Sequence, residues 1–412
     1  MANPVFRNTL YTSDNLYVLL GLDSGLVDLI YLDPPFNSKR TYSAPVGSKA
    51  AGASFKDMWT WKDVDEHNLD SLAVSHPDLT KFIAGAGEIH GKPMMAYLTY
   101  MSQRVVEMRR VLKDTGSFYL HCDPTAGHYL KIMLDGIFGK KNFIAEIIWS
   151  YAWGVRTTRR WNRKHDVILM YAKSRIFTFN YSAVMEKRRE EVLRRLEFGS
   201  ASATMAADRG KSGDRTMALP TDVWYIPTLN AMSKERTGYP TQKPLDLLKR
   251  IVLASSNEGD VVMDPFCGCA TTCVAAQQLG RKWIGIDVEE QARNVLIRRL
   301  SSDAGGIFND FTATRLMPRR TDLTEVPPSG GVKQRLFGEQ QGKCNACGQA
   351  FEPRNLEIDH IVPKSKGGGD YYENYQLLCG SCNRIKGDRP MEYLRMKIAT
   401  LERAGNRASF GE

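Results

Sequence analysis

Two short loops carry residue types that could bind and hold a small ligand. Asp33-Pro-Pro-Phe36 follows the apolar run Val27–Leu32, which is typical of a buried parallel strand. Far downstream, the turn Asp264–Ala270 follows the short apolar run Val261–Met263. Open α/β sheets bind ligands at the carboxyl ends of their strands, so we expect both loops to border one site. Taken alone, Asp-Pro-Pro would more simply be a strand followed by a proline turn.

The second loop has the pattern of a nucleoside-binding turn. It contains Gly268 and leads into a run of helical composition, Thr271–Leu279. The next apolar run, Trp283–Ile286, ends at Asp287, and an acid about twenty residues beyond such a glycine turn commonly accepts hydrogen bonds from ribose hydroxyls. Many structural turns share the glycine pattern, so this signal is weak without its neighbours.

Four of the eight cysteines have the spacing of a metal site. They form two Cys-x-x-Cys pairs, which are typical of a structural zinc site. Disulfides are not expected in a chain made in a reducing compartment. We expect the tail to need this metal to fold. The zinc ligands would be Cys344, Cys347, Cys379 and Cys382. The remaining thiols, expected to be buried and inert, are Cys122, Cys267, Cys269 and Cys273.

Composition and charge limit the possible partners. The chain has 412 residues, a net charge of +10 and no long apolar run, so we expect no membrane span and no secretory signal peptide. Positive charge concentrates between Arg156 and Arg215, where fifteen Lys and Arg stand against seven Asp and Glu. Such a segment, with Trp153 and Trp161 at its leading edge, would neutralise the phosphates of double-stranded DNA.

Parts of this basic segment have a simpler interpretation. The run 185–196 alternates Glu and Arg as an exposed helix would. The run 211–216 is expected to be a mobile loop that orders on DNA. Earlier in the chain, the runs Gly116–His121 and His165–Ala172 favour strands, and Leu98–Leu112 favours a helix. His121 and His165 are interpreted as ordinary structural histidines.

Together these motifs resemble the amino-methylating DNA methyltransferases, which use S-adenosylmethionine. Thr241-Gln-Lys243-Pro244 matches the element that precedes the cofactor loop in that family. Because the Asp33 loop precedes the cofactor loop, the order resembles the circularly permuted beta class. That resemblance implies an α/β, Rossmann-like sheet with helices on both faces, an inserted target-recognition region and a possible homodimer.

The resemblance also implies residue roles. Asp33 and the carbonyl of Pro34 would accept both hydrogens of an exocyclic amine, Pro35 would help to fix the loop, and Phe36 would stack on a base swung out of the duplex. Lys243 would face the methionine carboxylate. The expected cofactor-binding residues are Lys243, Asp264, Phe266, Gly268, Cys269, Thr271 and Asp287. Asp at the first motif position favours adenine N6 as the target; the alternative is cytosine N4.

The tail resembles the HNH nucleases in residue identity and order. Leu356-Glu-Ile-Asp359-His360 stands between the two cysteine pairs, and Asn383 follows the second. By resemblance His360 would be the general base, and Asp359 and Asn383 would hold magnesium or manganese. Asn374 would fix the loop and orient the imidazole. The alternative is a zinc-stapled module that binds DNA without cutting it.

These interpretations define a domain layout. Residues 1–325 form the methyltransferase domain with a recognition region at about 173–238, residues 326–334 form a linker, and residues 335–412 form a small ββα-metal domain. The expected function is restriction–modification. The protein would be encoded by a prokaryote or a phage and would act on DNA in the cytoplasm. A dinucleotide-dependent oxidoreductase would leave the Asp33 loop, the basic segment and the tail unexplained.

Overall fold

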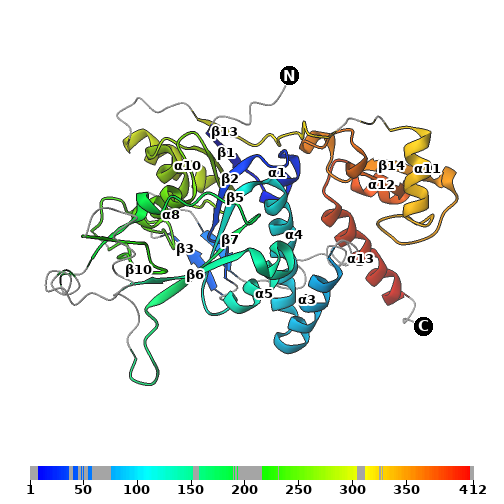
Figure 1. The fold of residues 1–412 in the computed structure, drawn as a ribbon. Helices are drawn as coiled ribbons and strands as arrows, with labels where there is room; N and C mark the ends of the chain where they lie inside the picture. Colours follow the sequence, from blue (N-terminus) through cyan, green and yellow to red (C-terminus); the bar gives the residue numbers. More distant parts are fainter. Residues whose placement is uncertain are drawn as a thin grey trace.

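The computed structural model describes residues 8–36, 40–44, 48, 50, 54–57, 76–151, 157–188, 190, 193, 216–230, 232–303, 311–323, 326 and 328–408. Its centre is a nine-stranded sheet (Figure 1). In spatial order the strands are β10 (Val223–Tyr225), β6 (Phe143–Ser150), β7 (His165–Ala172), β5 (Leu112–Cys122), β2 (Val27–Leu32), β11 (Val261–Asp264), β12 (Lys282–Asp287), β1 (Thr9–Thr12) and β13 (Thr312–Thr314).

Strand direction places the functional loops at one edge of this sheet. All its pairings are parallel except those that β7 makes with β5 and β6. β2 and β11 are neighbours, so the loops after Leu32 and Asp264 leave the sheet side by side. The connection between β6 and β7 leaves at the same edge, because Cys122 at the end of β5 pairs near the start of β7.

Helices cover both faces of the sheet, as the sequence predicts (Figure 1). Alternating side chains of β2 serve the two layers: Ile30 and Leu32 pack on one face, and Leu29 and Tyr31 on the other. The first layer contains α1 (Asn15–Gly21), α3 (Pro77–His90), α4 (Lys92–Val111) and α5 (Gly127–Phe138). The second contains α8 (Leu245–Ser255), α9 (Thr271–Gln278) and α10 (Glu290–Asp303).

Two small antiparallel pairs lie outside the main sheet. β3 (Arg40–Ser43) pairs with β4 (Ser54–Asp57) just after the Asp33 loop. β8 (Glu186–Lys187) pairs with β9 (Met217–Ala218), so the expected helix over 185–196 does not begin there. The charge pattern of that run is also compatible with a short strand. The sequence alone does not show that this strand pairs with β9. The expected mobile loop at 211–216 lies outside the described residues apart from its last position.

The C-terminal module is a separate ββα unit with its own core. β14 (Leu356–His360) and β15 (Tyr375–Cys379) form an antiparallel pair, followed by α12 (Gly380–Lys386) and α13 (Met391–Ala408). The side chain of Ser329 caps α11 (Gly330–Glu339), which therefore begins inside the stretch expected as a linker. Val332 of α11 is buried against Leu377 and Leu378 of β15. Among the described helices, none combines the length and apolar character needed to cross a membrane.

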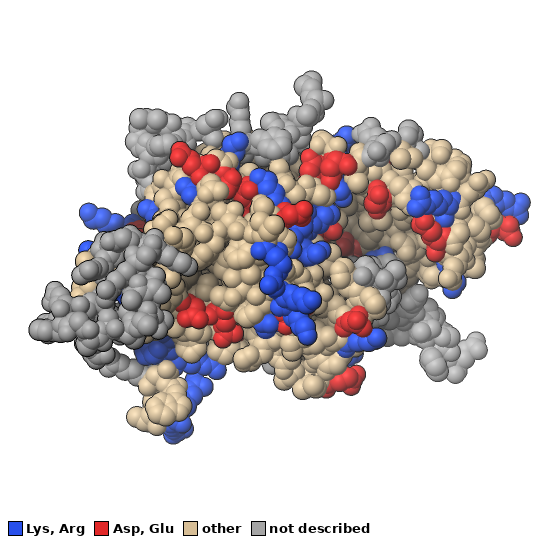
Figure 2. All heavy atoms as spheres, viewed as in Figure 1, with Lys and Arg blue, Asp and Glu red and all other residues tan. Residues whose placement is uncertain are grey.

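Basic side chains gather where the β6–β7 connection projects from the sheet edge. Arg159, Arg160 and Arg163 are exposed there, and Trp161 is 96% exposed between them. Figure 2 shows Lys and Arg at this projection, at the lower left. These side chains belong to the segment that the sequence predicts to meet DNA phosphates, which stays a prediction. Of the rest of the basic segment, only parts are described.

Candidate functional site

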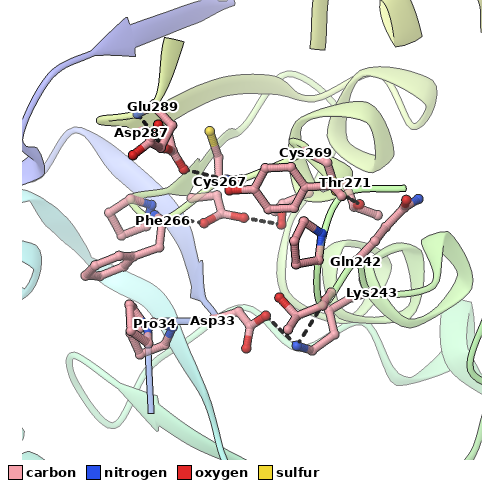
Figure 3. A pocket seen from close by; sticks show the side chains of 18 of the residues that line it. Asp33, Pro34, Gln242, Lys243, Phe266, Cys267, Cys269, Thr271, Asp287 and Glu289 are labelled. Carbon is pink, nitrogen blue, oxygen red and sulfur yellow. Dashed lines mark hydrogen bonds and ion pairs between the residues drawn. The ribbon is translucent and has the colours of Figure 1, made fainter. Parts of the chain in front are cut away.

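One cavity of about 330 Å³ joins the two loops predicted from the sequence. Every residue expected to act in methyl transfer or to bind the cofactor lines it. They are Asp33, Pro34, Pro35, Phe36, Lys243, Asp264, Phe266, Gly268, Cys269, Thr271 and Asp287. In Figure 3, Asp33 and Lys243 point toward one another, and Asp287 and Glu289 lie at the far end. The volume and the mixed polar and apolar lining suit a small ligand.

Asp33 offers an unused acceptor to this cavity. One oxygen, Oδ2, forms an ion pair with the ammonium of Lys243. The other, Oδ1, is buried and has no hydrogen-bond partner within the described part of the chain. A buried acceptor without a partner is costly, so a ligand that donates a hydrogen there would be favoured. Lys243 was expected to face the methionine carboxylate; in this structure its ammonium lies against Asp33.

The cofactor loop is held by the side chains at its two ends. Asp264 accepts a hydrogen bond from the amide of Phe266 at 3.1 Å and one from the hydroxyl of Thr272 at 2.5 Å. Burial raises the pKa of Asp264 to about 7. Arg299 of α10 donates to the carbonyl of Cys269 at 2.8 Å, which fixes the loop from behind. Asp264 therefore has a structural role in this loop. Its expected contact with the cofactor stays a prediction.

Asp287 lies where the sequence places it, at the end of β12 and on the cavity wall. Its carboxylate accepts from the amide of Gly268 at 2.8 Å and from that of Glu289 at 2.9 Å. Burial raises its pKa to about 6. Gly268 has a positive φ of 49°, and a Cβ there would approach the Tyr239 ring at 2.9 Å. Ala270 takes a left-handed conformation at the start of α9.

Several cavity residues were not predicted from the sequence. They come from segments that are remote in the chain and carry no motif. Tyr42 and Asp57 belong to the β3–β4 pair, and Asn15 of α1 donates to the carbonyl of Pro265 at 2.7 Å. Tyr239 stands two residues before the matched element Thr241–Pro244, and this closeness was the one available signal for it.

A second group of predicted site residues lies in the C-terminal module. The ring of His360 is held by Asp370, with Nε2 at 2.8 Å from the carboxylate, and by an edge contact with Tyr375. Asn374 was expected to fix the loop and orient this imidazole. Its amide bonds both backbone groups of Val362 at 2.8 and 3.0 Å, so it fastens the loop, whereas Asp370 holds the ring.

The two expected cation ligands of this module have further partners. Asp359 pairs with Lys386, which is fully buried, and accepts from Gln376 at 2.8 Å. The side-chain amide N–H of Asn383 donates a hydrogen bond to the carboxylate of Glu357 at 2.6 Å. The side-chain oxygen of Asn383 takes no part in that hydrogen bond. Amide and carboxylate oxygens are the ligands that magnesium and manganese prefer. Sequence reasoning missed Glu357, Asp370 and Lys386.

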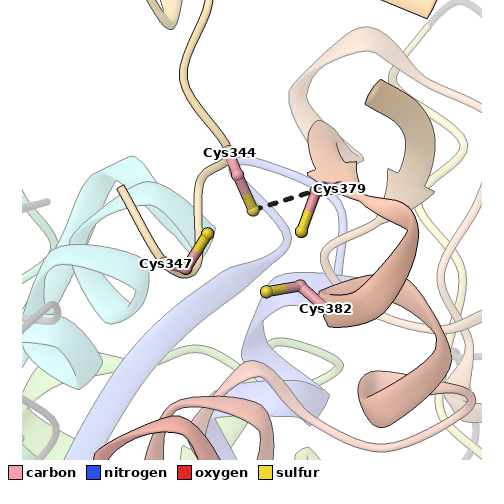
Figure 4. A group of neighbouring side chains, drawn as sticks. All are labelled: Cys344, Cys347, Cys379 and Cys382. Atoms are coloured by element: carbon pink, nitrogen blue, oxygen red, sulfur yellow. Dashed lines mark hydrogen bonds between the residues drawn. The ribbon is translucent and has the colours of Figure 1, made fainter. Parts of the chain in front are cut away.

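The four expected zinc ligands converge in space. The sulfurs of Cys344, Cys347, Cys379 and Cys382 all lie within 4.8 Å of one another (Figure 4). The amide of Cys379 donates to the sulfur of Cys344 at 3.3 Å. Four thiolates from two Cys-x-x-Cys turns are the donor set of a closed structural zinc site. The other four cysteines, in the larger N-terminal part of the chain, are buried as expected.

Comparisons with known proteins support the family resemblance of both the N-terminal part of the chain and the C-terminal module. Residues 27–298 match the DNA methylase family, and residues 344–389 match the HNH endonuclease family. DNA adenine methyltransferase YhdJ of Escherichia coli (strain K12) is 27% identical over 335 residues, covering 78% of this chain and 93% of that protein. Type II methyltransferase M.HpaI of Haemophilus parainfluenzae is 27% identical over 317 residues, covering 77% and 81%.

Among solved structures, the M1.HpyAVI-SAM complex aligns with a TM-score of 0.42 at 17% identity, over 71% of this chain and 98% of that one. The match to the DNA methylase family spans well over half of the sequence and contains both cavity loops. The chain therefore belongs to the DNA methylase family and carries an HNH endonuclease domain at its C-terminal end.

Proposed function

We propose that this protein transfers a methyl group from S-adenosylmethionine to N6 of adenine in double-stranded DNA. The single observation that carries this proposal is Oδ1 of Asp33, a buried acceptor without a hydrogen-bond partner among the described residues, in a cavity shared with the cofactor loop. The exocyclic amine of adenine is a hydrogen donor of the kind that this oxygen lacks. S-adenosylmethionine supplies an activated methyl group, so the protein has mainly to position the amine.

Each cavity residue then has a proposed task. Asp33 and the carbonyl of Pro34 accept the amine hydrogens and draw its lone pair out of conjugation with the ring. Phe36 stacks on the flipped base. At the other end of the cavity Asp287 receives the ribose hydroxyls, and the loop residues Phe266 and Gly268 border the nucleoside. Lys243, paired with Asp33 at that end of the cavity, would also face the methionine carboxylate when the cofactor binds.

The alternative target is N4 of cytosine, an amine of similar chemistry. Asp33 at the first motif position favours adenine, and the adenine methyltransferase among the relatives supports the same choice. Nucleosides from DNA treated with the protein and S-adenosylmethionine decide between the two. N6-methyladenine supports the proposal, and N4-methylcytosine alone replaces it with the alternative.

We also propose that the C-terminal domain cuts DNA, so that the chain serves restriction–modification. His360, held by Asp370, would take a proton from the attacking water. Asp359 and Asn383 would hold magnesium or manganese at the scissile phosphate, and the four cysteines would bind one structural zinc. The relatives that are type II methyltransferases support the restriction–modification setting. The permuted family further suggests a homodimer, which sedimentation at twice the mass of one chain would support.

A plasmid assay tests the nuclease proposal. Plasmid from a methylation-free host is incubated with the protein and magnesium or manganese, with and without S-adenosylmethionine. Cutting or nicking that His360→Ala abolishes supports the nuclease, and His128→Ala, an exposed histidine on α5, is the matched control. Plasmid that stays intact under every condition, although the protein binds it, would make the domain a DNA-binding module.

A further inference from the structure

A buried histidine backs the proposed base-stacking ring. His121 lies at the end of β5 and is fully buried. Its ring and that of Phe36 are stacked, with centroids 6.0 Å apart and planes 30° apart. Trp149 of β6 meets the same imidazole edge-on at 5.6 Å. The imidazole is therefore enclosed by aromatic rings and lies directly beside the loop that would hold the target base.

Both nitrogens of this imidazole have hydrogen-bond partners. Nδ1 lies 3.0 Å from the hydroxyl of Tyr31, and Nε2 lies 3.2 Å from the carboxylate of Asp166. Burial alone would raise the pKa of Asp166, but its hydrogen bond with His121 helps to bring that pKa below its usual value. An ionised carboxylate can only accept, so Nε2 carries the hydrogen and Nδ1 accepts the hydrogen of Tyr31.

These bonds fix the plane of the imidazole. Tyr31 lies two residues before Asp33 on β2, and Asp166 lies near the start of β7. With partners on two different strands, the ring cannot rotate without breaking a buried hydrogen bond. Phe36 follows two prolines, which have no amide hydrogen to anchor that loop. The stacked imidazole supplies a support for the ring that the backbone of the loop lacks.

We propose that His121 is a positioning residue for methyl transfer, which holds the Phe36 ring at the angle that the flipped base needs. Tyr31 and Asp166 fix the imidazole in turn. Asp166 also accepts from the hydroxyl of Tyr151 at 3.2 Å, and Tyr151 begins the basic β6–β7 connection. The support of Phe36 is thus continuous with the surface expected to meet DNA. This inference rests on the proposed function, because it requires Phe36 to stack on the target base.

Substitution at position 121 tests the inference. His121→Gln can keep an N–H for Asp166 but removes the flat ring that backs Phe36. We expect kcat for methyl transfer to fall roughly tenfold to a hundredfold, the scale on which small misplacements slow reactions, while the Kd for S-adenosylmethionine stays unchanged. With a duplex that carries 2-aminopurine at the mapped target base, the fluorescence rise on flipping should shrink. The matched control is His128→Gln on α5.

A second pair of variants covers the case in which His121→Gln does not fold. Asp166→Asn keeps an oxygen that can accept from Nε2, and Asp166→Ala does not. We expect Asp166→Asn to retain most of the wild-type kcat. The kcat of Asp166→Ala should fall by the same factor as that of His121→Gln. A wild-type kcat and fluorescence rise in His121→Gln, or equal rates in the two Asp166 variants, would overturn the inference.

The same assay separates this inference from the proposed function. Phe36→Ala and Asp33→Ala are measured in parallel. If both lose methyl transfer while the His121 and Asp166 variants keep it, only the positioning role fails. If Phe36→Ala and Asp33→Ala both methylate DNA at the wild-type rate, the proposed function itself fails.

Discussion

Lys243 already occupies one oxygen of Asp33, so the two oxygens of this carboxylate have different tasks. The ion pair fixes the orientation of the side chain and leaves Oδ1 as the buried acceptor. A carboxylate that is ionised and held in place before the substrate arrives does not have to reorganise during the reaction. This arrangement explains how a loop whose two prolines have no amide hydrogens can present an acceptor at a defined point.

Replacement of Asp33 tests this assignment directly. Asp33→Ala should lower the rate of methyl transfer to DNA by roughly a hundredfold or more, the scale on which a positioned contact in the transition state acts. The Kd for S-adenosylmethionine, measured by calorimetry, should change little, because the variant also frees Lys243. Asp78→Ala on α3, an exposed acid, is the control. A collapse of cofactor affinity with normal turnover at saturating cofactor would contradict the assignment.

The buried Asp287 predicts a pH dependence of cofactor binding. Its pKa is raised to about 6 by burial, so it is protonated in acid and becomes an ionised acceptor as the pH rises through that value. Affinity for S-adenosylmethionine should therefore increase between about pH 5 and about pH 7 and then level off. Calorimetry across this range should show that Asp287→Asn removes the rise. The same slope in the variant would assign the titration to another group, such as Asp264.

Sequence patterns identified the residues whose chemistry is local to a motif. Asp33, Gly268 and Asp287 all line the cavity, because each stands at the end of a strand, or in the turn after one, whose apolar run is visible in the sequence. Asp57 and His121 were missed as site residues. Their positions beside the cavity loops depend on strand order, and no spacing in the sequence encodes that order.

At the scale of the elements, apolar runs located the strands well and helix ends less well. β2 spans the predicted Val27–Leu32, and β7 spans the predicted His165–Ala172. α4 begins at Lys92, six residues before the predicted start: Pro93 occupies its first turn, and the buried apolar spacing already includes Met94 and Tyr97. The Gly330-Gly331 pair indicated a linker, whereas the cap from Ser329 and the burial of Val332 make it the start of α11.

We expect the C-terminal domain to depend on zinc bound by its four cysteines. The cysteines come from the turn at 344–347 and from the β15–α12 junction, so the metal would join the two halves of a small core. Cys344→Ser should lower zinc content from one equivalent per chain and make the tail sensitive to protease, because metal-binding energy is folding energy here. Methyl transfer should persist. Cys122→Ala should keep the zinc. A zinc-free wild type with a protease-resistant tail would contradict the structural role.

At the scale of the whole molecule, the two enzymatic domains are fastened to each other. Asp23, after α1, accepts from the amide and the hydroxyl of Thr321 at 2.5 and 2.6 Å. Tyr17 of α1 donates to Glu392 of α13 at 2.6 Å. Figure 1 shows the C-terminal domain beside α1. The end of the methyltransferase domain, which leads into the C-terminal domain, is thus bound to the loop after α1.

This attachment predicts a protease-protected connection. Asp23→Ala removes the acceptor for Thr321 and the neighbouring amide, so trypsin should cut faster after Arg319 or Arg320 than in the wild type. Methyl transfer should not change, because Asp23 lies outside the cavity. Asp78→Ala should digest like the wild type. Equal rates of cutting at these arginines in all three proteins would show that the contact does not protect the segment.

The most direct test of the central claim is mass spectrometry of nucleosides from unmethylated DNA incubated with the protein and isotopically labelled S-adenosylmethionine. The account predicts labelled N6-methyladenine with the wild type and with His360→Ala, and none with Asp33→Ala. Labelled N4-methylcytosine alone, no labelled nucleoside with the wild type, or undiminished N6-methyladenine with Asp33→Ala would contradict it.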